Sequence, residues 1–378
     1  MTNWPTKKLG EVLELCDAGT WGPENLNGMP LLRSSNMQNG KLVLDDLKYI
    51  EVPESKKKYY TLIDGDILIT KSSGSVDHIG KSLYITEAMD SVYGFSNFTQ
   101  RLRVNQDIAI PKWIYFKISN PATRSFLLDS SQTTTGLRNL KISALKELVI
   151  PLPPLEIQKK IVKKIEDLFA KITQTQSLHE SSTNDTNELL KMTLSKVFSN
   201  PELKRWQASN IGDISEFSSG EFLSSKMQIN GKHSVYGGNG ILGTHNNYNC
   251  EKRTVIIGRV GAYCGVVHIT EPESWITDNA LMLRKLDSSL DLIFLSLYLK
   301  YLNLNQHAKV SAQPSISQST IKRLRIYFPP IVEQKKIVER IDELTQKVRE
   351  LQQFQSETAA NLTALKQSIL HKAFQGEL

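Results

Sequence analysis

The sequence has few of the residues that cross-link secreted proteins or anchor proteins in membranes. It contains three cysteines, Cys16, Cys250 and Cys264, and none of them is paired at the spacing of a metal site. An odd and scattered set favours a reducing compartment without disulfides, so we interpret each thiol as a small buried side chain. No apolar run reaches the ~18 residues of a membrane span, and residues 1–5 do not resemble a signal peptide. We therefore expect a cytoplasmic protein that does not cross a membrane.

The motifs of common enzyme classes are also missing. The sequence lacks a Gly-x-x-x-x-Gly-Lys-Ser/Thr phosphate loop, an Asn/Asp-Pro-Pro-aromatic segment, and any His, Cys, Asp and Glu cluster at metal-ligand spacing. Asp45, Glu54 and Lys56 match a nuclease metal site only loosely, by their letters. We expect no catalytic residue, no metal and no cofactor on this chain. A self-contained methyltransferase or nuclease is the competing hypothesis, and an S-adenosylmethionine-binding assay would distinguish the two.

The charge balance is mildly basic. Lys and Arg number 46 against 39 Asp and Glu, a formal net charge of +7. This excess fits a protein that contacts phosphates over part of its surface, although many soluble proteins carry as much.

One segment of the sequence occurs twice. Residues 153–168 and 329–344 share a Pro-Pro start, a Gln at Gln158 and Gln334, and the Lys-Lys-Ile-Val that follows each Gln. The offset of 176 residues still holds at Phe198 and Phe374. A fixed internal period of this size indicates a duplicated unit.

Each copy has the pattern of a long helix. A double proline suits a first helical turn, and the apolar residues then follow steps of four and three, which is a heptad seam. The seam positions are Ile161, Ile165, Leu168 and Ile172, and Ile337, Ile341, Leu344, Val348, Leu351, Leu362, Leu365 and Ile369. We expect the two seams to pair within one chain, with pairing to another protein as the alternative. The polar stretch Ser181–Asn187 predicts a break or a bend.

The segment before each helix also follows a shared plan. Both units open on a tryptophan, Trp4 and Trp206, and the first unit is longer by 26 residues. We expect buried strands at 65–71 and 254–261, helices at 113–117 and 292–299, and strands at 148–152 and 324–328. The segments 72–75, 133–140 and 311–316 are predicted to be polar, flexible loops.

Candidate nucleic-acid contacts are basic and polar residues in or beside these loops, because Arg and Lys contact phosphates and guanine while Asn reads adenine. They are Lys71, Ser72, Ser73, Gly74, Thr134, Arg138, Lys141, Tyr236, Gly238, Asn239, His245, Asn246, Lys252, Arg253, Arg259, Gln313 and Ser315. Solvated surface charges and plain turns are the alternatives. Gly238–Gly243 also matches the letters of a dinucleotide fingerprint, but the residues after it are poor helix formers, so we expect a glycine turn that presents Tyr236, Asn239, His245 and Asn246.

Taken together, these motifs resemble a specificity subunit of a type I restriction–modification enzyme over essentially the full length. The resemblance rests on the doubled Pro-Pro helix, the Trp-x-x-x-x-Leu/Ile-Gly-Glu/Asp opening of each unit, the loop 236–240 and the ending 367–378. The first unit lacks the Tyr-Gly-Gly-Asn-Gly letters in its counterpart region, around Arg33–Met37. In this family that region varies with the target, so contacts cannot be carried from one unit to the other.

The resemblance implies a mixed α/β (α+β) fold with a pseudo-two-fold internal repeat. Two target-recognition domains, 1–152 and 201–328, would be separated by two long antiparallel helices, 153–200 and 329–378, that form an intramolecular coiled coil. Each domain would read one half of a bipartite, asymmetric DNA site.

The resemblance also implies partners. The helices would set the spacer and dock two DNA methyltransferase subunits, and restriction/translocase subunits would complete the complex. S-adenosylmethionine, ATP and Mg²⁺ are expected on those partner subunits. The alternatives are a specificity subunit of a methyltransferase-only or fused system, and a coiled-coil interaction protein without DNA readout.

Overall fold

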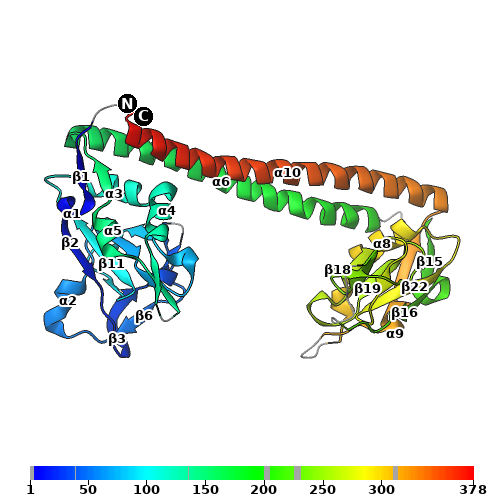
Figure 1. Ribbon diagram of the computed structural model, residues 1–378. Helices are drawn as coiled ribbons and strands as arrows, with labels where there is room; N and C mark the ends of the chain where they lie inside the picture. The colour runs from blue at the N-terminus through cyan, green and yellow to red at the C-terminus, as the bar shows by residue number, and fades with distance from the viewer. Residues whose placement is uncertain (1–3, 39, 135, 200–204, 225–230, 310–313) are drawn as a thin grey trace. The chain divides into compact units, whose positions relative to one another are not determined.

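The computed structural model describes residues 4–38, 40–134, 136–199, 205–224, 231–309 and 314–378. The chain divides into two compact units (Figure 1). Unit 1 comprises Met1–Leu178 and Glu357–Leu378, and unit 2 comprises His179–Ser356. Each unit therefore holds one globular part, called domain 1 or domain 2 below, together with one end of each long helix.

Domain 1 is built on a four-stranded antiparallel sheet of order β2-β11-β7-β9. Its strands are β2 (Leu13–Ala18), β11 (Thr99–Val104), β7 (Ile67–Thr70) and β9 (Ser82–Tyr84). The smaller sheets are β10 (Gly94–Phe95), β3 (Glu24–Leu32) and β6 (Lys48–Ile50); β12 (Gln132–Thr134), β13 (Leu137–Asn139) and β8 (Ser72–Ser73); β1 (Thr6–Lys8) and β14 (Val149–Pro151); and β4 (Met37–Gln38) and β5 (Lys41–Leu42). The helices are α1 (Leu9–Val12), α2 (Glu54–Tyr60), α3 (Pro111–Ile118), α4 (Pro121–Asp129) and α5 (Ile142–Lys146), with 3-10 turns at Ser34–Asn36, Val76–His78 and Glu87–Met89.

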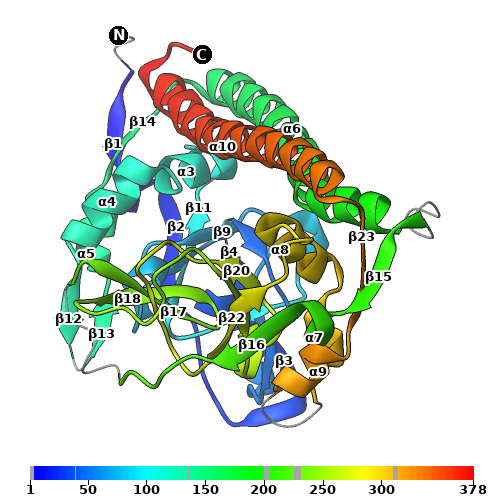
Figure 2. The same cartoon turned by 90° about the vertical axis from the view of Figure 1, so that its right-hand side faces the viewer.

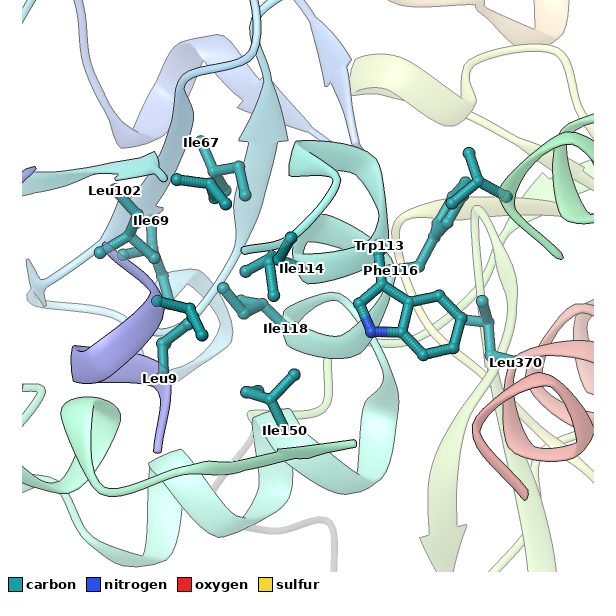
Figure 3. Close-up of a cluster of buried hydrophobic side chains, with 14 of the residues drawn as sticks. Leu9, Ile67, Ile69, Leu102, Trp113, Ile114, Phe116, Ile118, Ile150 and Leu370 are labelled. Atoms are coloured by element: carbon teal, nitrogen blue, oxygen red, sulfur yellow. The ribbon is translucent and has the colours of Figure 1, made fainter. Parts of the chain in front are cut away.

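The central strand β7 is apolar at successive positions because both of its faces are covered. Ile67 and Ile69 belong to the cluster formed with Trp113 and Ile114 of α3 (Figure 3). Leu68, on the opposite face, belongs to a second cluster with Leu32 and Phe95. The sequence therefore predicted this strand correctly, and Pro111 begins the covering helix where proline is tolerated.

Domain 2 repeats the plan. Its main sheet has the order β16-β22-β19-β20, with β16 (Ser215–Ser219), β22 (Ala280–Leu286), β19 (Val255–Gly258) and β20 (Val267–Ile269). The smaller sheets are β18 (Gly240–His245), β17 (His233–Gly237) and β21 (Trp275–Ile276), and β15 (Gln207–Asn210) and β23 (Arg325–Phe328). The helices are α7 (Ile211–Ile214), α8 (Leu292–Tyr301) and α9 (Gln318–Lys322), with 3-10 turns at Gly261–Tyr263 and Leu304–His307.

The two long helices are α6 (Leu155–Phe198) and α10 (Ile331–Gln375), and they lie side by side and antiparallel (Figures 1 and 2). In unit 1 the Lys366 ammonium donates to Gln176 Oε1 at 2.9 Å, and Ile165 and Ile369 are buried in one cluster. In unit 2 the pairing continues through Gln355 and Thr186. The prediction of an intramolecular helix pair is confirmed.

The seam is narrower than the heptad pattern predicted. Leu351 and Leu365 are 42% and 47% exposed, whereas Ile165, Ile341 and Val348 are buried. A straight α-helix has 3.6 residues per turn, so a strict seven-residue pattern rotates away from the contact line along a long helix.

Of the break or bend predicted at Ser181–Asn187, the break is wrong, because α6 remains helical through this stretch. Its polar residues find a partner on α10. The buried Gln355 side chain donates to Ser182 Oγ at 3.2 Å and to Thr186 Oγ1 at 3.0 Å, and Thr186 is itself buried. Thr186 and Gln355 therefore form a buried polar contact between the two helices, whereas most of the other residues of the stretch are exposed.

The repeated glutamine explains how each domain is joined to its helix. Gln158 Oε1 accepts from the Ile110 N–H at 2.9 Å, and its amide donates to the Pro153 carbonyl at 2.8 Å. Gln334 accepts from the Asp291 N–H at 2.8 Å and donates to the Pro329 carbonyl at 2.7 Å. Ile110 and Asp291 are the N-cap residues of α3 and α8. Both glutamines are buried, so each ties the start of a long helix to the start of a domain helix.

Two predicted loops are ordered as strands. Ser72 and Ser73 form β8, and residues 132–134 and 137–139 form β12 and β13, of which β13 pairs with β8. Backbone pairing satisfies polar groups that the composition alone assigned to solvent. The corresponding stretch 311–316 lies partly outside the described residues.

Candidate nucleic-acid interface

Lys71 and Arg259 occupy equivalent places in the two domains. Each is the first residue after the central strand, β7 or β19. The Lys71 N–H donates to the Phe98 carbonyl at 2.9 Å, and its carbonyl accepts from the Leu140 N–H at 2.8 Å. Arg259 is held in the same way, by Asn279 and Ile316, at 2.9 Å each. We call this end of each central strand the basic end of its domain.

Several candidates of domain 1 gather at its basic end. Ser73 pairs with Arg138 and Ser72 with Asn139 in the β8–β13 ladder, and Ser72 Oγ donates to Asn139 Oδ1 at 2.6 Å. The Arg138 guanidinium contacts its own domain, through Ser131 Oγ and the Leu128 carbonyl at the end of α4. Arg138 therefore braces the hairpin, which leaves fewer of its donors for a ligand.

The other candidates of domain 1 differ in exposure. Lys71 is half-buried, and burial lowers the pKa of its ammonium. Gly74 lies in open space, and Lys141 is an exposed N-cap residue of α5. Thr134 ends β12.

The glycine turn of domain 2 also lies at its basic end. Gly238 and Asn239 join β17 to β18, and a side chain placed on Gly238 would meet Asn279 and Gly258. Asn239 is exposed, as predicted. A strand follows the turn, so no helix N-terminus is available to hold a pyrophosphate there.

Tyr236 is not presented to a partner, which corrects the prediction. Its side chain is 5% exposed and lies in a cluster with Ile256 and Ile276, and its hydroxyl accepts from the Glu271 N–H at 3.2 Å. A strand alternates its side chains between two faces, and the face carrying Tyr236 is covered by the neighbouring sheet.

The remaining candidates of domain 2 do not form one group. Arg259 follows β19, whereas Lys252 and Arg253 are exposed residues before that strand, at its other end. His245 and the exposed Asn246 lie at the end of β18 away from the turn, where the His245 ring packs edge-on to Trp275 at 5.2 Å. Ser315 pairs with Val260 at the basic end, and Gln313 lies outside the described residues.

Two exposed aromatic residues, Trp21 and Phe222, are not among the nucleic-acid contacts predicted from the sequence. Both follow the first strand of the main sheet in a Gly-x-aromatic triplet, Gly19–Trp21 and Gly220–Phe222. This shared triplet is a signal that a comparison of the two openings could have found.

Nothing in the described part of the chain indicates a metal centre, since no three His, Cys, Asp or Glu side chains are grouped to hold an ion. Cys264 is buried and Cys16 and Cys250 are half-buried, and burial raises the pKa of all three thiols. The helices of the described residues include none with the length and apolar character needed to cross a bilayer.

The two domains of one plan can be compared with known protein families. The sequence model described as type I restriction modification DNA specificity domain matches residues 1–180 and 204–359. The chain belongs to this family. Its membership confirms the family predicted from the sequence, and the two matched segments fall on the two duplicated halves.

Relatives within the family cover part of the chain. The EcoKI specificity subunit of Escherichia coli strain K12 is 28% identical over 53% of this chain and 43% of its own length. The StySPI specificity subunit of Salmonella potsdam is 25% identical over 63% of this chain and 51% of its own length. The chain thus spans about half the length of these curated relatives.

A solved structure resembles the whole chain. It comes from work on complex assembly and conformational transition of the type I R-M system, and it covers 99% of this chain and 98% of its own with a TM-score of 0.80 at 22% identity. This likeness establishes that the two chains share the fold.

Proposed function

We propose that this chain is the DNA-specificity subunit of a type I restriction–modification complex. Each domain reads one half of a bipartite site, and the halves differ, so the site is asymmetric. The chain itself carries no catalytic group. S-adenosylmethionine, ATP and Mg²⁺ bind to the partner subunits, and the complex works in the cytoplasm.

One observation carries the proposal: equivalent places in the two domains carry unlike segments. Leu32 pairs with Phe95 in domain 1, and Tyr236 pairs with Ile276 in the same way in domain 2. The segments that follow Leu32 and Tyr236 therefore occupy equivalent places. In domain 1 the connection to β6, the next strand of the same sheet, runs from residue 33 to residue 47 and contains β4 and β5. In domain 2 the connection from β17 to β18 is the turn at Gly238 and Asn239. A common frame with different segments beside a shared cation suits two readers of different sequences.

The long helices support the rest of the proposal. A helix pair that begins at one domain and ends at the other can set the spacer between the half-sites. We propose that its outer faces dock two methyltransferase subunits and that restriction/translocase subunits join through them.

Methylome sequencing of cells with and without the gene tests the proposal. We expect one motif with two unequal halves and an unread spacer to lose its methylation when the gene is removed. An unchanged methylome, or loss of a continuous motif, would contradict the proposal. Methylation by the complex without sequence preference would contradict it as well.

A matched insertion tests the role of the helices. Seven residues added after Leu178 and seven before Glu357 lengthen both helices by about 10 Å, because each residue adds about 1.5 Å. The spacer should then grow by about three base pairs, at ~3.4 Å per step, while the half-site letters stay the same. A change of letters with an unchanged spacer would refute this role.

A further inference from the structure

Trp21 and Phe222 are the most exposed aromatic side chains among the described residues, at 75% and 74%. Tryptophan has a large apolar ring and is usually well covered in a folded protein. A single exposed ring is common on protein surfaces, but an exposed ring that recurs at the equivalent place in two domains suggests a surface that another molecule covers.

The two rings occupy the same place in the two domains. The Thr20 N–H donates to the Phe95 carbonyl at 2.9 Å, and the Glu221 N–H donates to the Ile276 carbonyl at 2.9 Å. Phe95 and Ile276 end the equivalent strands β10 and β21. The shared fold therefore places an exposed aromatic residue one position further on in each domain.

The backbone beneath each ring is held firmly. A Cβ on Gly19 would lie 2.0 Å from the Phe95 carbonyl oxygen, and one on Gly220 would lie 2.4 Å from that of Ile276. Real side chains do not approach a backbone oxygen so closely, so only glycine allows the chain to lie against the next strand. Both rings thus project from a fixed backbone.

Each ring also lies on the side of its domain that carries the basic end. In domain 1 the Asn97 N–H donates to the Thr20 carbonyl at 3.0 Å, and the next residue, Phe98, accepts from the Lys71 N–H. In domain 2 Arg259 Nη1 donates to Ser219 Oγ at 3.2 Å, next to Gly220. A cation and an aromatic ring on the same side of a domain suit nucleic acid, because the cation can contact a phosphate and the ring can pack against bases.

We propose that Trp21 and Phe222 contact DNA directly, each packing its ring against bases of one half-site, as an apolar wedge does at a base step. This inference rests on the proposed function and adds to it a positioning residue in each domain. The cation and the ring then fix where each domain sits on its half-site, while the segments that differ between the domains select the letters.

The test uses the full-length chain and a duplex carrying the motif found by methylome sequencing. Trp21→Ala and Phe222→Ala should each weaken binding about tenfold, since stacking on one base contributes on that scale. Trp21→Phe and Phe222→Trp should retain affinity. The matched control is Phe126→Ala, an exposed aromatic at 48% on α4 outside the shared triplet, and it should bind as the wild type does.

Tryptophan fluorescence adds a readout of stacking itself. Binding of the duplex should quench the wild-type signal, Trp21→Phe should lose that quenching, and Phe222→Trp should increase it. Both rings are exposed, so all variants should keep the wild-type unfolding temperature.

Unchanged affinity in both alanine variants, together with unchanged quenching in Trp21→Ala, would overturn the inference while leaving the proposed function intact. Alanine variants that bind the duplex normally but fail to capture methyltransferase subunits would also overturn it, because the rings would then be a protein-docking surface. Failure of the wild-type chain to bind the duplex would remove the proposed function and this inference together.

Discussion

Domain 1 and domain 2 share the frame that carries their surfaces and differ in what is attached to it. Both have the same sheet order, the same glutamine contact to a long helix and a cation after the central strand. Domain 1 adds α2, α4 and the connection 33–47, whereas domain 2 has the helix-free segment 246–254, the 3-10 turn Leu304–His307 and the turn at Gly238 and Asn239 at the corresponding places. The comparison shows that packing specifies the frame, while the segments on its surface are free to diverge.

The largest predicted difference in stability between the two domains comes from Arg101 of β11, inside the main sheet of domain 1. The Arg101 side chain is 1% exposed and donates to the Asp17 carboxylate at 2.7 and 3.0 Å. The equivalent strand position in domain 2 is Met282, which lies opposite Ser218. Asp17→Ala should destabilise domain 1 by about 3 kcal/mol, because it leaves a buried charge unpaired. Hydrogen exchange of the β11 amides measures the effect within that domain.

Two variants sharpen this prediction. Asp17→Ser with Arg101→Met copies the pair of domain 2 and should recover most of the lost stability. Ser218→Ala, the matched change in domain 2, removes an exposed bond from Arg284 and a long bond to the Ser219 carbonyl, and it should have little effect. If Asp17→Ala leaves exchange in β11 unchanged, the buried pair is not what separates the two domains.

The shared glutamines should behave alike. Gln158→Ala strands the half-buried Ile110 N–H and the buried Pro153 carbonyl. Gln334→Ala strands the equivalent pair and also the Ser289 carbonyl, to which its amide donates at 2.8 Å. Each substitution should cost about 1–3 kcal/mol. Exchange at Ile110 and at Asp291 should accelerate by similar factors. The exposed neighbour Lys159→Ala, which breaks only a surface ion pair with Glu156, is the control. A large effect in only one domain would mean that the two helix junctions are not equivalent.

Alkaline pH should produce a smaller difference in stability, with unit 1 losing more stability than unit 2. Burial, with Asp64 and Glu166 nearby, raises the pKa of Tyr84 to about 12, and the equivalent position in domain 2 is Ile269. The folded state favours the neutral phenol, so this stabilisation is complete below pH ~10 and is lost as the pH rises towards ~12. Tyr84→Phe should reduce the alkaline loss of stability in unit 1 relative to unit 2. An equal loss in wild type and variant would contradict the assignment.

Much of the frame could be predicted from the sequence because its signals are local. The doubled Pro-Pro helix and the apolar run Ile67–Ile69 carry their own periodicity. The polar stretch Ser181–Asn187 misled the prediction because Gln355, which satisfies it, is far away in the sequence. Leu351 and Leu365 were wrongly predicted to lie in the seam because the heptad pattern departs from the true helical repeat.

The candidate interface was less predictable because strand order decides which loops meet. Lys252 and Arg253 have the same chemistry as Arg259, but they lie at the other end of β19. Tyr236 sits beside an exposed turn, but its strand points it into the core. Trp21 and Phe222 become notable only when pairing shows that their backbones are equivalent.

Footprinting of the duplex with single-domain variants tests most directly whether each domain reads its own half-site. The account predicts two protected blocks of unlike sequence, separated by an unprotected spacer. Lys71→Ala should weaken protection of one block, and Arg259→Ala should weaken protection of the other. Weakening of the same block by both variants, or a single continuous block, would contradict it.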